Sequence, residues 1–123
     1  MNVVDSSGWL AYFANDVNAS RFAPIIQATD HLLVPTICIY EVFKRVLIQR
    51  DEEDALRAIG IMSLGTSVEL TQEIAINAAQ ISNNSKLAMA DSIILATART
   101  HKATLWTQDA DFEGIEGVEY IAK

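Results

Sequence analysis

Short β-branched runs alternate along this chain with longer segments of helical periodicity, and this alternation restricts its possible folds most strongly. The first run, Val3 and Val4, stops at the polar residues 5–8, as expected for a buried strand that leads into a helix. Further strands are predicted at 31–34, 67–70, 103–106 and 118–121. Because helical segments separate most of these strands, we expect a three-layer α/β/α sandwich with a central parallel sheet. The 123 residues suit a single domain, 1–123.

Capping residues and apolar periodicity set the predicted helix boundaries. Thr36 and Thr71 are predicted N-caps, and the acidic run 51–54 is a predicted first helical turn, where negative charge complements the helix dipole. Residues 83–85 are predicted to form a polar loop. The predicted helices begin near residues 6, 20, 37, 51, 72 and 87 or 90, and end near 13, 26, 48, 62, 81 and 100.

The sequence shows no sign of a secreted or membrane protein. The only cysteine, Cys38, lies between two isoleucines, so we interpret it as a buried core residue rather than a functional thiol. No basic segment followed by an apolar one opens the chain, and we expect a soluble cytoplasmic protein with no membrane partner. The net charge of −7, taken alone, argues against a nucleic-acid partner.

Four carboxylates are predicted to project over the same end of the sheet. Asp5 and Asp109 follow predicted strands, Glu41 lies in the second turn of a helix, and Asp91 begins another. Each also has a purely structural explanation. Asp5 and Asp91 suit N-caps, Glu41 could pair with Arg45 four residues later, and Asp109 could bond its own turn. Asp111 is a fifth acid, two residues beyond Asp109.

A cluster of carboxylates favours a bound cation. Like-charge repulsion raises the pKa of neighbouring carboxyls unless a cation neutralises them. Oxygen ligands select Mg²⁺ or Mn²⁺, whereas two histidines and one cysteine offer little basis for a zinc site. Such ions activate water and stabilise charge on a phosphodiester.

Four segments carry a resemblance to a known family. They read Val-Val-Asp-Ser-Ser-Gly-Trp-Leu, Pro-Thr-Ile-Cys-Ile-Tyr-Glu-Val, Ala-Met-Ala-Asp-Ser-Ile-Ile-Leu-Ala-Thr-Ala and Leu-Trp-Thr-Gln-Asp-Ala-Asp-Phe. In order and spacing they resemble the PIN-domain family, and more narrowly the VapC-type toxins of toxin-antitoxin pairs. The resemblance implies an endoribonuclease that depends on Mg²⁺ or Mn²⁺ and hydrolyses RNA phosphodiester bonds. It also implies a cognate antitoxin protein and a homodimer.

The same resemblance implies roles for individual residues. Asp5, Glu41 and Asp91 match the core metal ligands, and Asp109 matches the fourth acid. Asp111 is the alternative for that position, although we favour Asp109 and expect Asp111 to cap a short turn. The implied supporting residues are Thr107, Ser6 and Asp111.

Under this interpretation, the net negative charge is a weaker argument against a nucleic-acid partner. Without Asp5, Glu41, Asp91 and Asp109 the net charge of −7 becomes −3, and bound divalent ions would reverse the local sign. The candidate phosphate contacts are Lys44, Arg45, Lys86 and Arg99, each of which could instead be an ordinary surface charge. Aromatic residues near the start could form a stacking platform or a partner groove, or pack in the core. These are Trp9, Tyr12, Phe13 and Phe22.

Two other functions are compatible with parts of the pattern. One is a noncatalytic binding module on the same fold, in which the acidic pocket is structural. The other is a receiver-like signalling domain that binds Mg²⁺ and accepts a phosphoryl group. A receiver-like domain needs paired acids after its first strand, whereas Asp5 is followed by two serines.

Overall fold

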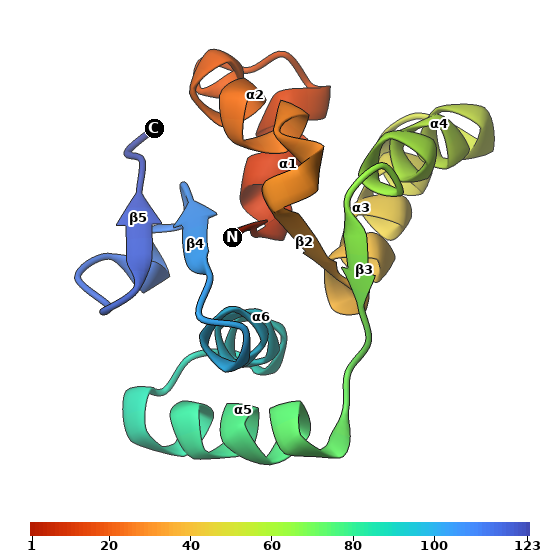
Figure 1. The fold of residues 1–123 in the computed structure, drawn as a ribbon. Coiled ribbons are helices and arrows are strands. Elements are labelled where there is room, and N and C mark those ends of the chain that lie inside the picture. The colour runs from red at the N-terminus through yellow and green to blue at the C-terminus, as the bar shows by residue number, and fades with distance from the viewer.

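The protein is built on one five-stranded parallel sheet, which the computed structural model shows for residues 1–123 (Figure 1). The strands are β1 (Asn2–Val4), β2 (Leu32–Pro35), β3 (Thr66–Val68), β4 (Thr104–Thr107) and β5 (Val118–Tyr120). Their order is β3-β2-β1-β4-β5, and every neighbouring pair is parallel. The predicted parallel α/β fold is therefore confirmed.

Six helices cover the two faces of this sheet. They are α1 (Ser6–Phe13), α2 (Ala19–Gln27), α3 (Thr36–Gln49), α4 (Glu52–Met62), α5 (Gln72–Ser85) and α6 (Met89–Thr100). Two 3₁₀ turns, η1 (Thr29–His31) and η2 (Ala110–Phe112), complete the chain. The chain runs outward from β1 to β3 and then returns to β4 on the other side of β1. Because parallel crossovers are right-handed, α1 to α4 cover one face and α5 with α6 the other (Figure 1). None of these helices is both long and apolar enough to cross a membrane.

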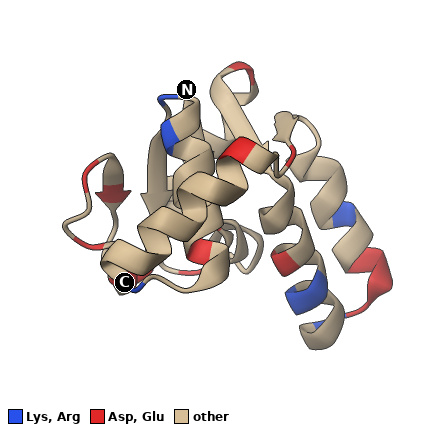
Figure 2. Cartoon of the chain, turned by 90° about the horizontal axis from the view of Figure 1, so that it is seen from below, with Lys and Arg blue, Asp and Glu red and all other residues tan.

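Charged residues are distributed unequally between surface and interior. All nine lysines and arginines are exposed. Of the 16 acidic residues, which Figure 2 shows in red along most of the chain, only five are buried or half-buried. These five are Asp5, Glu41, Asp54, Asp91 and Asp109. A carboxylate leaves water only at a cost, so each of these positions needs a local explanation.

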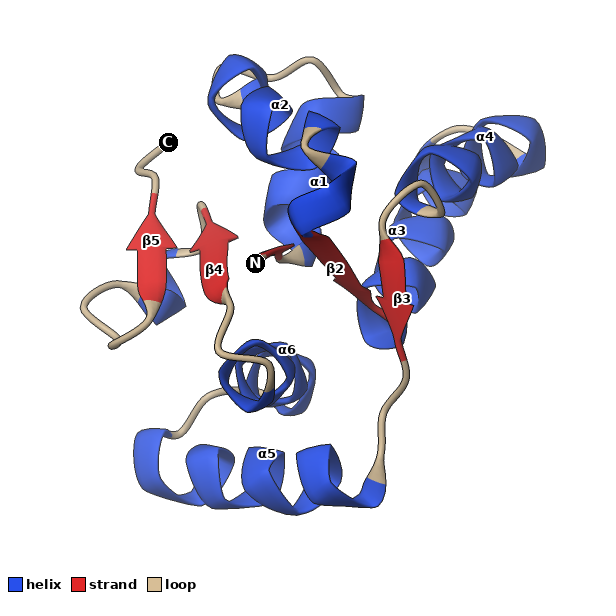
Figure 3. Cartoon of the chain, in the orientation of Figure 1, coloured by secondary structure: helices blue, strands red, loops and turns tan.

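The structure corrects several of the predicted boundaries. Figure 3 shows the helices and strands to which they belong. Thr36 is not the N-cap of α3, because β2 continues in register to Pro35, which occupies that position. The third strand covers Thr66–Val68 and not 67–70. Residues 83–85 belong to the last turn of α5, where the Ser85 hydroxyl donates to the Ile81 carbonyl at 2.6 Å. The predicted N-cap Thr71 is confirmed, since its hydroxyl accepts from the Ile74 N–H at 3.2 Å.

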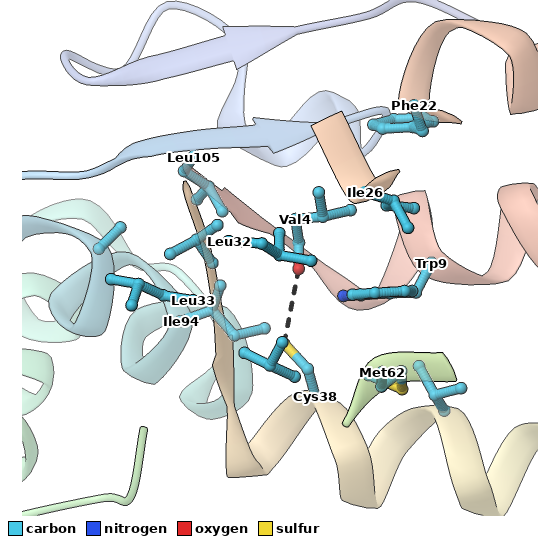
Figure 4. Packing of buried hydrophobic residues seen from close by; sticks show 14 of the residues in the cluster. Val4, Trp9, Phe22, Ile26, Leu32, Leu33, Cys38, Met62, Ile94 and Leu105 are labelled. Carbon is cyan, nitrogen blue, oxygen red and sulfur yellow. Dashed lines mark hydrogen bonds between the residues drawn. The ribbon is translucent and has the colours of Figure 1, made fainter. Parts of the chain in front are cut away.

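The main apolar core fills the space between the sheet and its covering helices (Figure 4). Cys38 is fully buried there, with its Sγ 3.9 Å from the Val4 carbonyl oxygen, which confirms its interpretation as a core residue. Burial raises the pKa of this thiol well above its usual value. Trp9 and Phe22 are also fully buried, so neither is available as a stacking platform.

Candidate metal centre

The carboxyl ends of β1 and β4 lie side by side at the point where the strand order reverses. Val4 pairs with Trp106, and the Asp5 N–H donates to the Trp106 carbonyl at 3.1 Å. In open α/β sheets, ligands bind outside the carboxyl ends of the strands at this kind of switch point. Asp5 and Thr107 therefore stand at the position in the fold that is best suited to a site.

Asp5 is a buried carboxylate held by three hydrogen bonds. Its side chain is 2% exposed, and Oδ1 accepts from the Ser7 hydroxyl at 2.7 Å and the Gly8 N–H at 3.0 Å. Oδ2 accepts from the Thr107 hydroxyl at 2.7 Å. Desolvation nevertheless raises the pKa of Asp5 from 3.8 to about 6, with a smaller contribution from Asp109. Asp5 thus caps α1, as the structural explanation expected, and also lies in the acidic site.

Glu41 is held toward α1 by a serine. It is half-buried in the second turn of α3, and its Oε1 accepts from the Ser6 hydroxyl at 2.6 Å. The alternative pairing of Glu41 with Arg45 does not form, because the ion pairs of the structure involve only Arg50 and Arg57. Ser6 therefore fixes the direction of a carboxylate that lies 35 positions away in the sequence.

Asp91 lies within electrostatic reach of the other four acids, of which only Asp109 and Asp111 belong with it to the close group of carboxylates. It is half-buried in the first turn of α6, where Ala88 occupies the N-cap, so its interpretation as a cap is wrong. Burial is the largest cause that raises the pKa of Asp91 from 3.8 to about 6. Further contributions come, in decreasing order, from Asp109, Asp5, Glu41 and Asp111. The structure therefore brings all the acids singled out in the sequence within electrostatic reach of one carboxylate.

Asp109 and Asp111 both lie beside Asp91. One carboxylate oxygen from each of these three residues lies within 4.8 Å of the other two. The Asp109 N–H donates to the Thr107 hydroxyl at 2.9 Å, and the Asp109 carboxylate accepts from the Asp111 N–H at 2.9 Å. Asp109 thus caps η2, and the prediction that Asp111 caps this turn is wrong. Both residues place a carboxylate oxygen near Asp91, so Asp109 and Asp111 both stay candidates for the fourth acid.

These side chains fit a hard divalent cation. The close group of possible ligands consists of carboxylates alone, without a histidine or a thiol. After burial, the charges of Asp109, Asp5, Glu41 and Asp111 raise the pKa of Asp91 further, and no lysine or arginine forms an ion pair with any of these acids. Oxygen ligands of this kind suit hard divalent cations such as Mg²⁺ and Mn²⁺.

The basic residues singled out in the sequence occupy different surroundings. Arg45 lines a cavity of about 550 Å³ that also includes Ser7 of the site. Lys44 lies over the Tyr40 ring, with its Nζ 5.8 Å from the ring centroid. Lys86 is the exposed left-handed residue that ends α5. Arg99 donates to the carbonyl of Glu116 at 3.1 Å.

Two site residues were missed by sequence reasoning. Ser7 bonds to Asp5 and lies 3.4 Å from the Thr107 hydroxyl, oxygen to oxygen. The Gln108 N–H donates to the Ser7 hydroxyl at 3.3 Å. The position of Ser7, two residues after Asp5, is visible in the sequence, but there it indicates only the start of a helix. For Gln108, the only feature in the sequence is its position directly after a strand.

Comparison with known families identifies the class of protein. Residues 3–118 match the PIN domain, and the chain therefore belongs to the PIN-domain family. This result confirms the resemblance drawn from the sequence motifs. No curated protein sequence matches the chain.

Several solved structures of toxin-antitoxin proteins are similar to this chain. A chain of a toxin-antitoxin complex from Klebsiella pneumoniae is 25% identical, with a TM-score of 0.81 and coverage of 98% of this chain and 100% of that one. A chain of VapBC2 from Rickettsia felis, bound to a promoter DNA fragment, is 13% identical, with a TM-score of 0.77 and 97% coverage of both chains. Mycobacterium tuberculosis VapC20, described as a sarcin-ricin loop cleaving toxin, is also 13% identical, with a TM-score of 0.74 and 92% coverage of both chains. At 13% identity these last two establish similarity of fold.

Proposed function

We propose that this protein is an endoribonuclease that requires Mg²⁺ or Mn²⁺, hydrolyses RNA phosphodiester bonds, and acts as the toxin of a toxin-antitoxin pair. The observation that carries the proposal is the group of acids around half-buried Asp91. Carboxylate oxygens of Asp109 and Asp111 lie within 4.8 Å of it, and Asp5 and Glu41 lie within electrostatic reach. Membership of the PIN-domain family supports it, as does the structural similarity to a toxin-antitoxin complex.

The proposed metal ligands are Asp5, Glu41, Asp91 and Asp109. Asp111 stands close enough to Asp91 to share in binding or to replace Asp109. The bound ion would supply activation of water and stabilisation of the charge that develops on the phosphate. Because their pKa values are raised to about 6, Asp5 and Asp91 bind a proton more readily than an ordinary carboxylate, and a proton competes with the metal.

Hydroxyl groups of the chain orient these acids. Thr107 and Ser7 each donate to a different oxygen of Asp5 and so fix its plane. The Ser6 hydroxyl donates to one oxygen of Glu41. We therefore assign Thr107, Ser6 and Ser7 as positioning residues, since their hydroxyls contact the acids.

Binding of RNA needs positive charge outside the acidic group. We propose Lys44, Arg45 and Lys86 as phosphate contacts, because all three are exposed and follow or precede site elements in the sequence. Loss of any one should weaken binding and its salt dependence rather than abolish cleavage.

Residues 1–123 are proposed to act as one domain in the cytoplasm, as a homodimer and in complex with a cognate antitoxin. Large apolar side chains exposed on α3, α4 and the loop after α4 provide surface for such contacts. They are Tyr40, Leu47, Ile48, Leu56, Ile61 and Leu64.

The test is cleavage of a mixed RNA pool by the purified protein, with Mg²⁺, with Mn²⁺ and with a chelator. Asp91→Asn removes one charge from the centre, and Glu69→Gln removes one from an exposed position outside it. We expect cleavage that requires metal in the wild type and Glu69→Gln, and none in Asp91→Asn. Cleavage by all three proteins would refute the site, and a correctly folded, inhibitor-free wild type that cuts nothing would instead favour a noncatalytic binding module.

A further inference from the structure

A cleft adjoins the acidic site on the side of α3 and α4. This cavity of about 550 Å³ is lined by side chains from α1, α3 and α4 together with residues near the carboxyl end of the chain. Ser7 and Gln108 belong to its lining, and both are hydrogen-bonded within the acidic site. The cleft therefore opens directly beside the acids that are proposed to bind metal.

The lining of this cleft is cationic in a strongly acidic protein. Four of the nine lysines and arginines of the chain line it, namely Arg45, Arg50, Arg57 and Lys123, against two acids. The chain as a whole carries a net charge of −7. Concentration of positive charge at one concave surface favours an anionic occupant. We call this surface the basic cleft.

The four cations of the basic cleft differ in whether they already form an ion pair. Arg50 pairs with Asp54 at 2.9 Å, and Arg57 pairs with Asp54 at 2.9 Å and with Glu53 at 3.1 Å. Arg45 and Lys123 form no ion pair in the structure. The unpaired cations are thus available to a ligand without the loss of an existing contact.

Both unpaired cations belong to segments that also reach the acidic site. Arg45 follows Glu41 by four residues on α3, and residues at this spacing share one helix face. Lys123 also lines a second opening, which includes Ser7, Gln108 and Asp109. The free positive charge of the basic cleft is therefore placed next to the acids.

A buried asparagine anchors the segment that carries Lys123. Asn18 is 4% exposed, and its side-chain amide donates to the Ala122 carbonyl at 3.0 Å and to the Gln108 Oε1 at 3.1 Å. These two bonds tie the residue before Lys123 to the loop that follows β4. The position of Lys123 is therefore linked to the loop that presents Asp109.

The remainder of the lining suits nucleobases. Seven of the sixteen lining residues are apolar, and Phe13 among them is half-buried. Single-stranded nucleic acids bind grooves that combine cationic residues for the backbone with apolar and aromatic surface for the bases. A small inorganic anion has no apolar surface that could pack against these apolar residues.

We propose that the basic cleft binds the single-stranded RNA segment that adjoins the cleaved phosphate, with Arg45 and Lys123 contacting its backbone. This inference rests on the proposed ribonuclease function and adds to it a path for the substrate. It assigns substrate binding to Lys123 and the positioning of Lys123 to Asn18. The sequence motifs indicate neither residue.

The test measures RNA binding without cleavage. Fluorescence anisotropy of a short labelled single-stranded RNA is followed with chelator present, over a range of salt concentrations. The variant Arg45→Gln/Lys123→Gln is compared with Arg21→Gln/Lys102→Gln, which removes the same charge from exposed positions outside the cleft. Thermal unfolding of each protein verifies that it is folded.

Two lost phosphate contacts should lower the slope of log affinity against log salt by about 1.4, at about 0.7 per contact for single strands. At about 0.1 M salt this slope corresponds to roughly 25-fold weaker binding. The control pair should retain the wild-type slope.

If the two double variants change RNA affinity and its salt dependence equally, the proposed role of the basic cleft is wrong. The nuclease proposal is then unaffected, provided the wild type still cuts RNA. A wild type that neither binds nor cuts RNA would overturn both. If the Arg45 and Lys123 substitutions spare RNA binding but weaken a complex with a partner protein, the cleft belongs to that protein and the inference is wrong.

Discussion

Replacing Asp5 by asparagine should stabilise the metal-free protein at neutral pH. Burial raises the pKa of this carboxyl from 3.8 to about 6 in the folded state, so the fold opposes its ionisation. One pKa unit corresponds to 1.36 kcal/mol, and a shift of roughly two units gives about 3 kcal/mol. Asparagine removes that cost because it carries no charge.

The hydrogen bonds of Asp5 permit this substitution. The amide oxygen of asparagine can accept from Ser7 and Gly8, as Oδ1 does now. The amide nitrogen would face the Thr107 hydroxyl, which now donates at 2.7 Å and can accept instead. The main change is therefore the loss of a buried charge.

The pH dependence follows from the direction of the shift. A carboxyl whose pKa is raised on folding contributes stability that is present below its unfolded pKa of 3.8 and lost as the pH rises through about 6. The advantage of Asp5→Asn should therefore be small near pH 4 and approach about 3 kcal/mol near pH 8. Neutralising Asp5 also relieves one of the repulsions on Asp91, which acts in the same direction.

Urea unfolding with chelator, repeated at about one-unit steps between these two pH values, measures the difference. Asp30→Asn, at an exposed position, controls for the loss of one charge. A free-energy difference between Asp5→Asn and wild type that stays constant with pH would refute the reasoning, because it would show that ionised Asp5 carries no cost.

Three further results are expected. Thr107→Val removes a buried hydroxyl that donates to Asp5 and accepts from Asp109, and should lower the free energy of unfolding in urea by about 1–3 kcal/mol. Gly8→Ala places a Cβ 2.6 Å from Val4 Cγ1 and 2.8 Å from Phe22 Cε1, and should cost about 1–3 kcal/mol, seen as a lower melting temperature. Mn²⁺ at about 100 times its dissociation constant should raise the free energy of unfolding by about 2.7 kcal/mol, and no shift on addition of Mn²⁺ would count against a metal site.

The architecture could be predicted from the sequence because its signals are local and repeated. Val3 and Val4 form a short apolar run that ends at Asp5, and the strand at 104–107 contains Leu105 and Trp106 and is followed by polar residues. The errors lie where tertiary contacts override a local preference. Thr36 is an apt capping residue, yet pairing of β2 with β3 extends the strand to Pro35 and moves the helix start.

The acids could be nominated from the sequence, but their environment could not. Parallel strands bring their carboxyl ends to one edge, which is why Asp5 and Asp109 were expected together. In the sequence, a helix cap and a member of an acidic site are alternative interpretations of Asp5, whereas in the structure the carboxylate that caps α1 also lies within electrostatic reach of Asp109.

The contacts that join distant segments have no sequence signature. Ser7 lies 100 positions from Thr107, and Asn18 lies 104 positions from Ala122. Asp111 likewise joins the acids only because η2 turns it back toward Asp91. Such contacts depend on how loops fold over the sheet, and periodicity carries no information on that.

The central claim is that these acids form one divalent-cation site, and calorimetric titration of Mn²⁺ into the metal-free protein tests it most directly. The titration is run at about pH 7.5, above the raised pKa values of about 6 of Asp5 and Asp91, with wild type, Asp91→Asn and Glu69→Gln. The account predicts a saturable isotherm for wild type and Glu69→Gln that is lost in Asp91→Asn. The same isotherm in all three proteins, or none in any, would contradict it.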